Sequence, residues 1–146
     1  MSELIFRYRH DPSFFDKDAA PDDFGYLTMS VTTERFSGCG SFWVQWQDVV
    51  EFGQSLATFP IQLEAPLGGK WGVMDQEGDN LALAVQIKPA NSTGDLLVTV
   101  EIGELQHNGD RARISFLTNY PDIERFARSL ARLMDGKIEQ AVLTGQ

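Results

Sequence analysis

Two stretches of the chain repeat one spacing of apolar residues. Residues 46–59 (WQDVVEFGQSLATF) and 120–133 (YPDIERFARSLARL) carry them at Val49, Phe52, Leu56 and Phe59, and at Ile123, Phe126, Leu130 and Leu133. The spacing i, i+3, i+7, i+10 places four side chains on one helical face. We therefore predict two amphipathic helices that cover a shared core.

The ends of both predicted helices carry recognisable signals. In the first helix, Asp48 with Glu51 three residues later resembles a capping box, and Pro60 is expected to end the helix. In the second, Pro121 suits the first helical position and Gly136 the end of the last turn.

Several other segments show the two-residue alternation of a strand with one buried face, most clearly Leu27, Met29 and Val31. The predicted strands are 4–9, 26–34, 41–46, 81–87, 96–105 and 111–118, with weaker candidates at 61–64 and 70–74. Charges beside 4–9 favour an edge strand. Turns are predicted at 37–40 (SGCG), 66–69 (PLGG) and 106–110, which contains Asn108-Gly109.

A hairpin followed by a helix occurs twice, in residues 26–59 and 96–133. With an offset of 74 residues Phe42 aligns with Phe116 and Trp46 with Tyr120. Internal duplication and convergent patterning both explain this repeat. Either way, residues 1–146 are expected to form a single α+β domain, a mostly antiparallel, twisted sheet of about six to eight strands with two helices on one face.

Charge limits the partners of this chain. With 12 Lys and Arg against 21 Asp and Glu, the formal net charge is −9. This charge repels phosphate, so neither nucleic acid nor an anionic membrane is predicted as a partner, whereas a basic protein would be attracted. The alternative is that the net charge only keeps the protein soluble.

Location is predicted from what the sequence lacks. The N-terminal MSELIFRYRH does not have the pattern of a signal peptide, and no apolar run approaches the roughly 20 residues that span a bilayer. The single Cys39 cannot form an internal disulfide, which fits a reducing compartment. We expect a cytoplasmic protein.

Catalytic signals are weak throughout the sequence. His10 and His107 have no second ligand at metal-binding spacing, and no base can be assigned to Cys39. The glycine-containing turns do not match phosphate-binding loops, and GxSxG and HExxH do not occur. We therefore predict no catalytic residue, cofactor or metal site, and an enzyme is the less favoured interpretation.

The acidic segment 10–25 and the tryptophans are the candidates for partner binding. Asp16, Asp18, Asp22 and Asp23 supply carboxylates, but the segment does not have the DxDxDG pattern of a calcium loop. The run SFWVQW breaks strand alternation at Trp43 and Trp46, whose large apolar area suits either a core or an interface. We predict these six residues as a partner-binding set.

The charged face of the second helix has two interpretations. Arg125, Arg128 and Arg132 could bind an anionic ligand, or they could form a solvated stripe in which Glu124 pairs with Arg128.

The order of features from EFGQSLATFP (51–60), through Trp71 and the hairpin LALAVQI (81–87) to LLVTVEI (96–102), to FARSLARL (126–133) resembles small bacterial domains grouped near the WapI-type immunity proteins. The resemblance covers most of residues 25–136. It implies a bacterial source and a role in neutralising a toxin, and it transfers no functional residue.

The leading hypothesis is a non-enzymatic bacterial protein-binding domain, an immunity protein that covers a toxin through an acidic surface. Two alternatives stay open. One is a small-molecule-binding or unrecognised enzymatic domain, which needs a pocket of about 300 Å3 or more. The other is a structural homodimer that pairs through exposed strands or aromatic residues.

Overall fold

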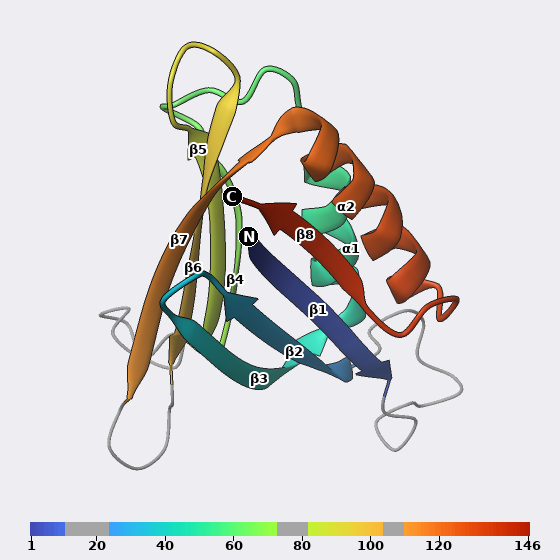
Figure 1. The fold of residues 1–146 in the computed structure, drawn as a ribbon. Coiled ribbons are helices and arrows are strands. Elements are labelled where there is room, and N and C mark those ends of the chain that lie inside the picture. The colour runs from blue at the N-terminus through green and yellow to red at the C-terminus, as the bar shows by residue number, and fades with distance from the viewer. Residues whose placement is uncertain (11–23, 73–81, 104–109) are drawn as a thin grey trace.

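The computed structural model describes residues 1–10, 24–72, 82–103 and 110–146, and in them the chain forms two helices and eight strands (Figure 1). In chain order these are β1 Ser2–His10, β2 Phe24–Thr32, β3 Ser37–Gln45, α1 Trp46–Ser55, β4 Leu67–Trp71, β5 Leu83–Pro89, β6 Asp95–Gly103, β7 Arg111–Asn119, α2 Tyr120–Met134 and β8 Ala141–Gly145. Neighbouring strands pair antiparallel throughout. The predicted α+β class is confirmed.

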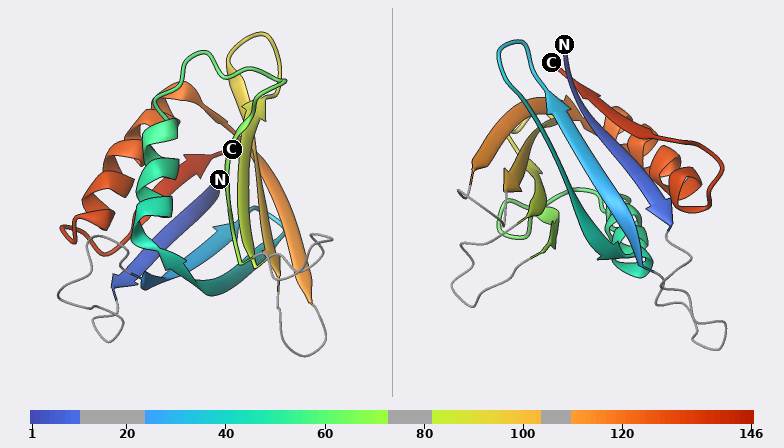
Figure 2. Two further views of the ribbon diagram at one scale, coloured as in Figure 1. Left: turned by 180° about the vertical axis from the view of Figure 1, so that it is seen from behind. Right: turned by 90° about the horizontal axis from the view of Figure 1, so that it is seen from below.

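The strands divide between two four-stranded sheets, in the orders β3-β2-β1-β8 and β4-β5-β6-β7. Figures 1 and 2 show the sheets as two inclined walls, with α1 and α2 side by side across the side where the walls diverge. Both helices therefore lie on the same side, as predicted. The sequence pattern did not predict the division into two sheets.

The two sheets meet where the edges of β7 and β8 approach each other. The Gln146 N–H donates to the Leu117 carbonyl oxygen at 2.9 Å, and the Thr118 hydroxyl donates to the Thr144 carbonyl oxygen at 2.8 Å. Each edge satisfies backbone groups that would otherwise be exposed. These two bonds join the two sheets along the edges of β7 and β8.

The two halves of the chain follow the same order of elements, three strands, a helix and a fourth strand. The fourth strand of each half joins the sheet of the other half, because β4 pairs with β5 and β8 pairs with β1. The offset of 74 carries the bounds of β3 onto those of β7. Hydroxyl pairs recur as well, Thr28 with Ser41 at 2.9 Å and Thr99 with Ser115 at 3.0 Å. The two halves therefore share one arrangement of elements.

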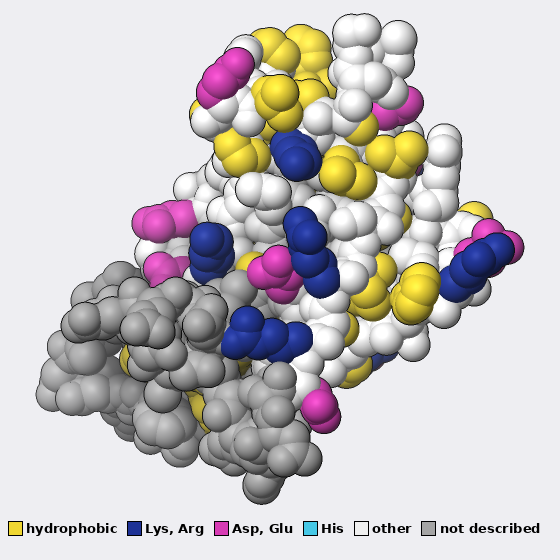
Figure 3. Space-filling view, turned by 90° about the vertical axis from the view of Figure 1, so that its left-hand side faces the viewer, with side chains coloured by type: hydrophobic (Ala, Val, Ile, Leu, Met, Phe, Trp, Pro, Cys, Tyr) yellow, Lys and Arg dark blue, Asp and Glu magenta, His cyan; other side chains and the backbone are white. Residues whose placement is uncertain are grey.

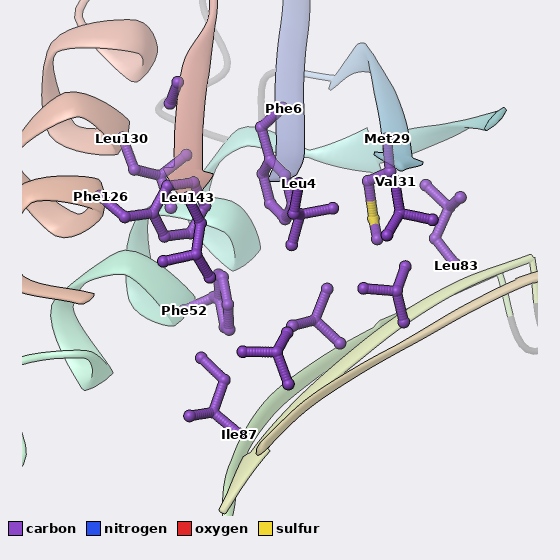
Figure 4. Packing of buried hydrophobic residues seen from close by; sticks show 14 of the residues in the cluster. Leu4, Phe6, Met29, Val31, Phe52, Leu83, Ile87, Phe126, Leu130 and Leu143 are labelled. Carbon is purple, nitrogen blue, oxygen red and sulfur yellow. The ribbon is translucent and has the colours of Figure 1, made fainter. Parts of the chain in front are cut away.

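The core is centred on Phe6 of β1, which is fully buried (Figure 4). Its ring centroid lies 6.0 Å from Phe52 of α1, 5.4 Å from Phe126 of α2 and 6.3 Å from Trp71 of β4. Four rings from four elements thus meet at one point, and the edge-on contacts to Phe126 and Trp71 have the geometry that aromatic pairs favour.

Helix α1 is shorter than its apolar pattern predicted. It ends at Ser55, so Phe59 lies outside it, 75% exposed, with its ring 4.8 Å from that of Tyr120. The predicted capping box is wrong, because Gln45 is the N-cap residue and its side chain makes no capping hydrogen bond.

Helix α2 follows its predicted signals closely. The Asn119 side chain accepts a hydrogen bond from the Asp122 N–H at 2.9 Å, and Pro121 lies in the first turn. Gly136, with φ of 75°, follows the last turn, where its N–H donates to the Leu133 carbonyl.

Several strand predictions need correction. β1 lies between β2 and β8 and is not an edge strand; its charged residues lie on the outer face of the sheet, opposite Leu4 and Phe6. Residues 37–40 belong to β3 and are not a turn, and a Cβ at Gly40 would collide with Ile102 of the facing sheet. The glycine thus permits close packing between sheets.

Other differences concern short segments. β4 includes Leu67–Gly69, where a turn was predicted, and ends before the expected residue 74. Residues 61–64 form no strand beyond the isolated Gln62–Ala65 bridge, and β8 was not predicted. The predicted 106–110 turn falls mainly outside the described residues.

Replacing Phe6 by alanine is expected to lower the free energy of unfolding by about 3–5 kcal/mol, because it leaves a cavity among three aromatic neighbours. Phe36 is the matched control. It is 67% exposed, so Phe36→Ala should change the free energy by no more than about 0.5 kcal/mol. Urea denaturation of both variants measures this, and equal effects would contradict the proposed centre of the core.

Candidate functional site

A row of three residues crosses the outer face of the sheet β3-β2-β1-β8. The register places Arg9 beside Tyr26 and Tyr26 beside Trp43. The rings of Tyr26 and Trp43 are 4.9 Å apart, and the Arg9 guanidinium carbon lies 5.8 Å from the centre of the Tyr26 ring, within cation–π range. We call Arg9, Tyr26 and Trp43 the aromatic row.

Strand alternation explains why the aromatic row faces outward. The next row in the register is Tyr8, Leu27 and Phe42, whose side chains point the other way and pack in the core: Leu27 is buried, and Tyr8 and Phe42 are half-buried. Trp43 nevertheless stays 40% exposed. A large aromatic side chain is therefore held by its neighbours and is still accessible.

Small polar pairs extend this face beyond the aromatic row. Thr28 and Ser41 form their hydroxyl pair directly beside it, and further along the Ser30 hydroxyl donates to the Cys39 Sγ at 3.3 Å. The face thus combines an aromatic end with a hydroxyl-bearing middle.

A cleft of about 570 Å3 lies between the free edge of β3 and the ends of β5, β6 and β7. We call it the β3 cleft. Its described walls are Tyr26, the consecutive residues 38–43, Ala82, Ile102, Gly103, Asp110, Arg111 and Ala112. Because Tyr26 and Trp43 take part in both features, the aromatic row and the β3 cleft form one continuous site.

The two tryptophans of SFWVQW have different environments. Trp43 belongs to the site, whereas Trp46 is half-buried at the start of α1, and its ring N–H donates to the Met134 carbonyl at the end of α2, at 2.8 Å. Tyr120, which corresponds to Trp46 in the second half, accepts a hydrogen bond through its hydroxyl from the Ile61 N–H at 3.1 Å. Trp46 therefore ties the two helices together.

The other predicted partner-binding residues, Asp16, Asp18, Asp22 and Asp23, lie outside the described residues. The segment that contains them connects His10 and Phe24. These two flanking residues are close neighbours of Arg9 and Tyr26 in their strands, so the aromatic row lies at the end of the sheet where the acidic segment is attached.

The acidity of the chain is unevenly distributed along the sequence. Segments 11–23, 73–81 and 104–109 contain nine of the 21 acidic residues and one of the 12 basic residues. The described part therefore has twelve acidic and eleven basic residues and is nearly balanced. On the side shown in Figure 3, Lys and Arg side chains lie among Asp and Glu, and Arg113 pairs with Glu101 at 3.3 Å.

The arginine face of α2 fits the solvated stripe. Arg128 pairs with Glu124 at 3.1 Å, as predicted, and Arg125 pairs with Asp122 at 2.8 Å. These exposed pairs contribute little to stability.

Within residues 1–10, 24–72, 82–103 and 110–146, no three His, Cys, Asp or Glu side chains come together as a metal site requires. Neither α1 nor α2 is both long and apolar enough to cross a membrane.

Sequence reasoning missed Arg9 and Tyr26 as companions of Trp43. Each is an ordinary outward residue of its own strand, and only the pairing register brings all three together. Comparison with known proteins adds nothing to this site, because no model of a protein family and no curated protein matches the chain.

The contrast between the two tryptophans can be tested by conservative substitution. Trp46→Phe should cost about 1 kcal/mol or more of unfolding free energy, because it leaves the Met134 carbonyl without its donor. Trp43→Phe should cost less than about 0.5 kcal/mol, as an exposed substitution. Thermal or urea unfolding of the pair measures the difference, and the reverse order would refute these assignments.

Proposed function

We propose that this protein is a non-enzymatic protein-binding domain and that the aromatic row contacts the partner. The outward-facing cluster of the exposed Trp43 and Arg9 with the half-buried Tyr26 between them carries the proposal. Tryptophan, tyrosine and arginine are the residues most enriched at energetically dominant positions of protein interfaces. Here, strand neighbours already hold the Tyr26 and Trp43 rings in contact, so little side-chain freedom remains to be lost on binding.

The partner that we propose is a basic protein. The net charge of −9 supports attraction of such a partner, and the acidic segment that holds Asp16, Asp18, Asp22 and Asp23 is attached beside the aromatic row. In this proposal the acidic residues accelerate encounter, and Trp43 and Tyr26 supply most of the affinity.

An immunity role in the bacterial cytoplasm is the biological form of this proposal. Its support is the sequence resemblance to WapI-type immunity proteins together with the acidity, and the partner would then be a toxin. An immunity protein acts by covering a surface, so it needs no catalytic group of its own.

A small-molecule ligand is the second candidate, and the β3 cleft is the observation that favours it. Its volume of about 570 Å3 falls within the range of about 300 to 1,000 Å3 that is common for ligand sites. Ser41, Asp110 and Arg111 supply polar groups to its walls.

Alanine substitution in the aromatic row tests the leading proposal. The immobilised chain should capture a basic protein from a lysate of its source cells, and Trp43→Ala or Tyr26→Ala should reduce that capture roughly tenfold or more, the loss typical of an interface anchor. Quantitative mass spectrometry of the captured proteins measures this.

Phe36→Ala is the matched control, because it removes an exposed aromatic ring outside the site and should leave capture unchanged. Absence of a captured protein, or capture that neither Trp43→Ala nor Tyr26→Ala weakens, would contradict the proposal. Native mass spectrometry showing a retained metabolite that Arg111→Ala releases would favour the small-molecule alternative.

A further inference from the structure

We infer that the β3 cleft binds an extended segment of the partner protein, which pairs with β3 as an added strand. This inference rests on the proposed protein-binding function and names the form that the partner takes at the site. Strand addition to an exposed sheet edge is an established mode of peptide recognition, in which main-chain hydrogen bonds supply much of the affinity.

β3 does not have the usual protection of an edge strand. Natural edges are kept from pairing by charges, proline, bulges or short length. β3 is nine residues long (SGCGSFWVQ), contains neither charge nor proline, and pairs with β2 in an unbroken register. Among the described strands, none pairs with its other side.

The other three edges are short, charged or covered. β4 and β8 have five residues each, and β4 contains Lys70. β7 contains Arg111 and Arg113 and is covered in part by the chain after β8. Among the four described edge strands, β3 is therefore the one that is long, uncharged and uncovered by another described strand.

The backbone N–H and C=O groups of β3 alternate in direction along the strand. Antiparallel neighbours alternate between pairs that exchange two backbone hydrogen bonds and pairs that exchange none. The Thr33 N–H donates to the Phe36 carbonyl at 2.8 Å at the end of the hairpin, and the register continues from there. The alternation therefore turns the N–H and C=O groups of Cys39, Ser41 and Trp43 away from β2, toward the β3 cleft.

The other half of the molecule contains the equivalent edge, that of β7. Leu117 of β7 is the counterpart of Trp43 at the offset of 74, and its carbonyl accepts the Gln146 N–H at 2.9 Å. Gln146 directly follows β8, and Thr144 of β8 accepts a hydrogen bond from Thr118 at the same edge. In the second half, then, the equivalent edge is already met by the end of an extended strand.

The walls of the β3 cleft define the segment that fits. An added strand would point alternate side chains to opposite faces. One set would extend the aromatic row beside Trp43, and the other would face the apolar wall formed by Phe42, Ala82 and Ile102. The structure thus assigns a segment with apolar residues at every second position.

A second copy of this chain does not fit the same space. Its own β3 is flanked by the ends of β5, β6 and β7, which form the opposite wall of the cleft. A tail or loop of a partner has no such flanking sheet, so it can enter the cleft.

The probe for this inference is a phage-displayed library of linear twelve-residue peptides, selected against the intact chain. Selection should enrich peptides with alternating apolar positions. A labelled synthetic copy of one such peptide should bind the Ser41→Pro variant at least roughly tenfold more weakly, because proline removes the outward N–H and obstructs the pairing strand.

The Ser41→Ala variant is the matched control, because it loses the same hydroxyl but keeps the amide, and its affinity should stay within about twofold of the parent. Proline is tolerated in an edge strand where its missing N–H faces outward, so the Ser41→Pro chain should fold. If circular dichroism shows that it does not, Cys39→Pro removes the neighbouring outward amide and replaces it in the test.

The outcomes separate this inference from the proposed function. A library that yields no alternating peptide, or peptide binding that Ser41→Pro leaves unchanged, overturns strand addition. Partner capture that is lost in Trp43→Ala but retained in Ser41→Pro would leave the protein-binding function standing and overturn strand addition alone. Loss of capture in both variants, with Ser41→Ala unaffected, is the result expected.

Discussion

The fold depends on the burial of one side chain, Phe6, between elements from both halves of the chain. It comes from the middle of a sheet, and its aromatic neighbours include one residue from each helix and one from the exchanged strand β4. None of β1, β4, α1 and α2 can leave its place without exposing part of this cluster. The outer surfaces are under no such constraint, and any partner-binding site is therefore expected on an outer face or a free edge.

The exchange of fourth strands makes the two halves interdependent, because each sheet is completed by the half it does not belong to. Hydrogen bonds also cross between the halves: the Trp46 ring N–H of α1 donates to the Met134 carbonyl of α2, and the Tyr120 hydroxyl of α2 accepts from the Ile61 N–H after α1. The two halves differ, however, at the corresponding strands β3 and β7. Gly38 and Gly40 of β3 stand where β7 has Ala112 and Ile114, and only the edge of β7 is met by a described segment.

The sequence predicted most elements because helical and strand periodicities record which side chains face the core. It predicted the second helix well and the first too long, since Phe59 fits the apolar spacing but follows the end of α1. The glycines of β3 favour a turn in the sequence, because close packing between sheets leaves no local signal. The site was predicted only at Trp43, since Arg9 and Tyr26 join it through a pairing register that no single segment encodes.

The edge of β3 must be open in the free protein if a partner strand is to pair with it. Amide hydrogen exchange, followed residue by residue by NMR, measures this. The amides of Cys39 and Ser41 should exchange at least roughly tenfold faster than those of Gly40 and Phe42, which bond to β2, because outward amides are open to water. Equal protection of both sets would contradict the account, because it would show that the edge is already occupied.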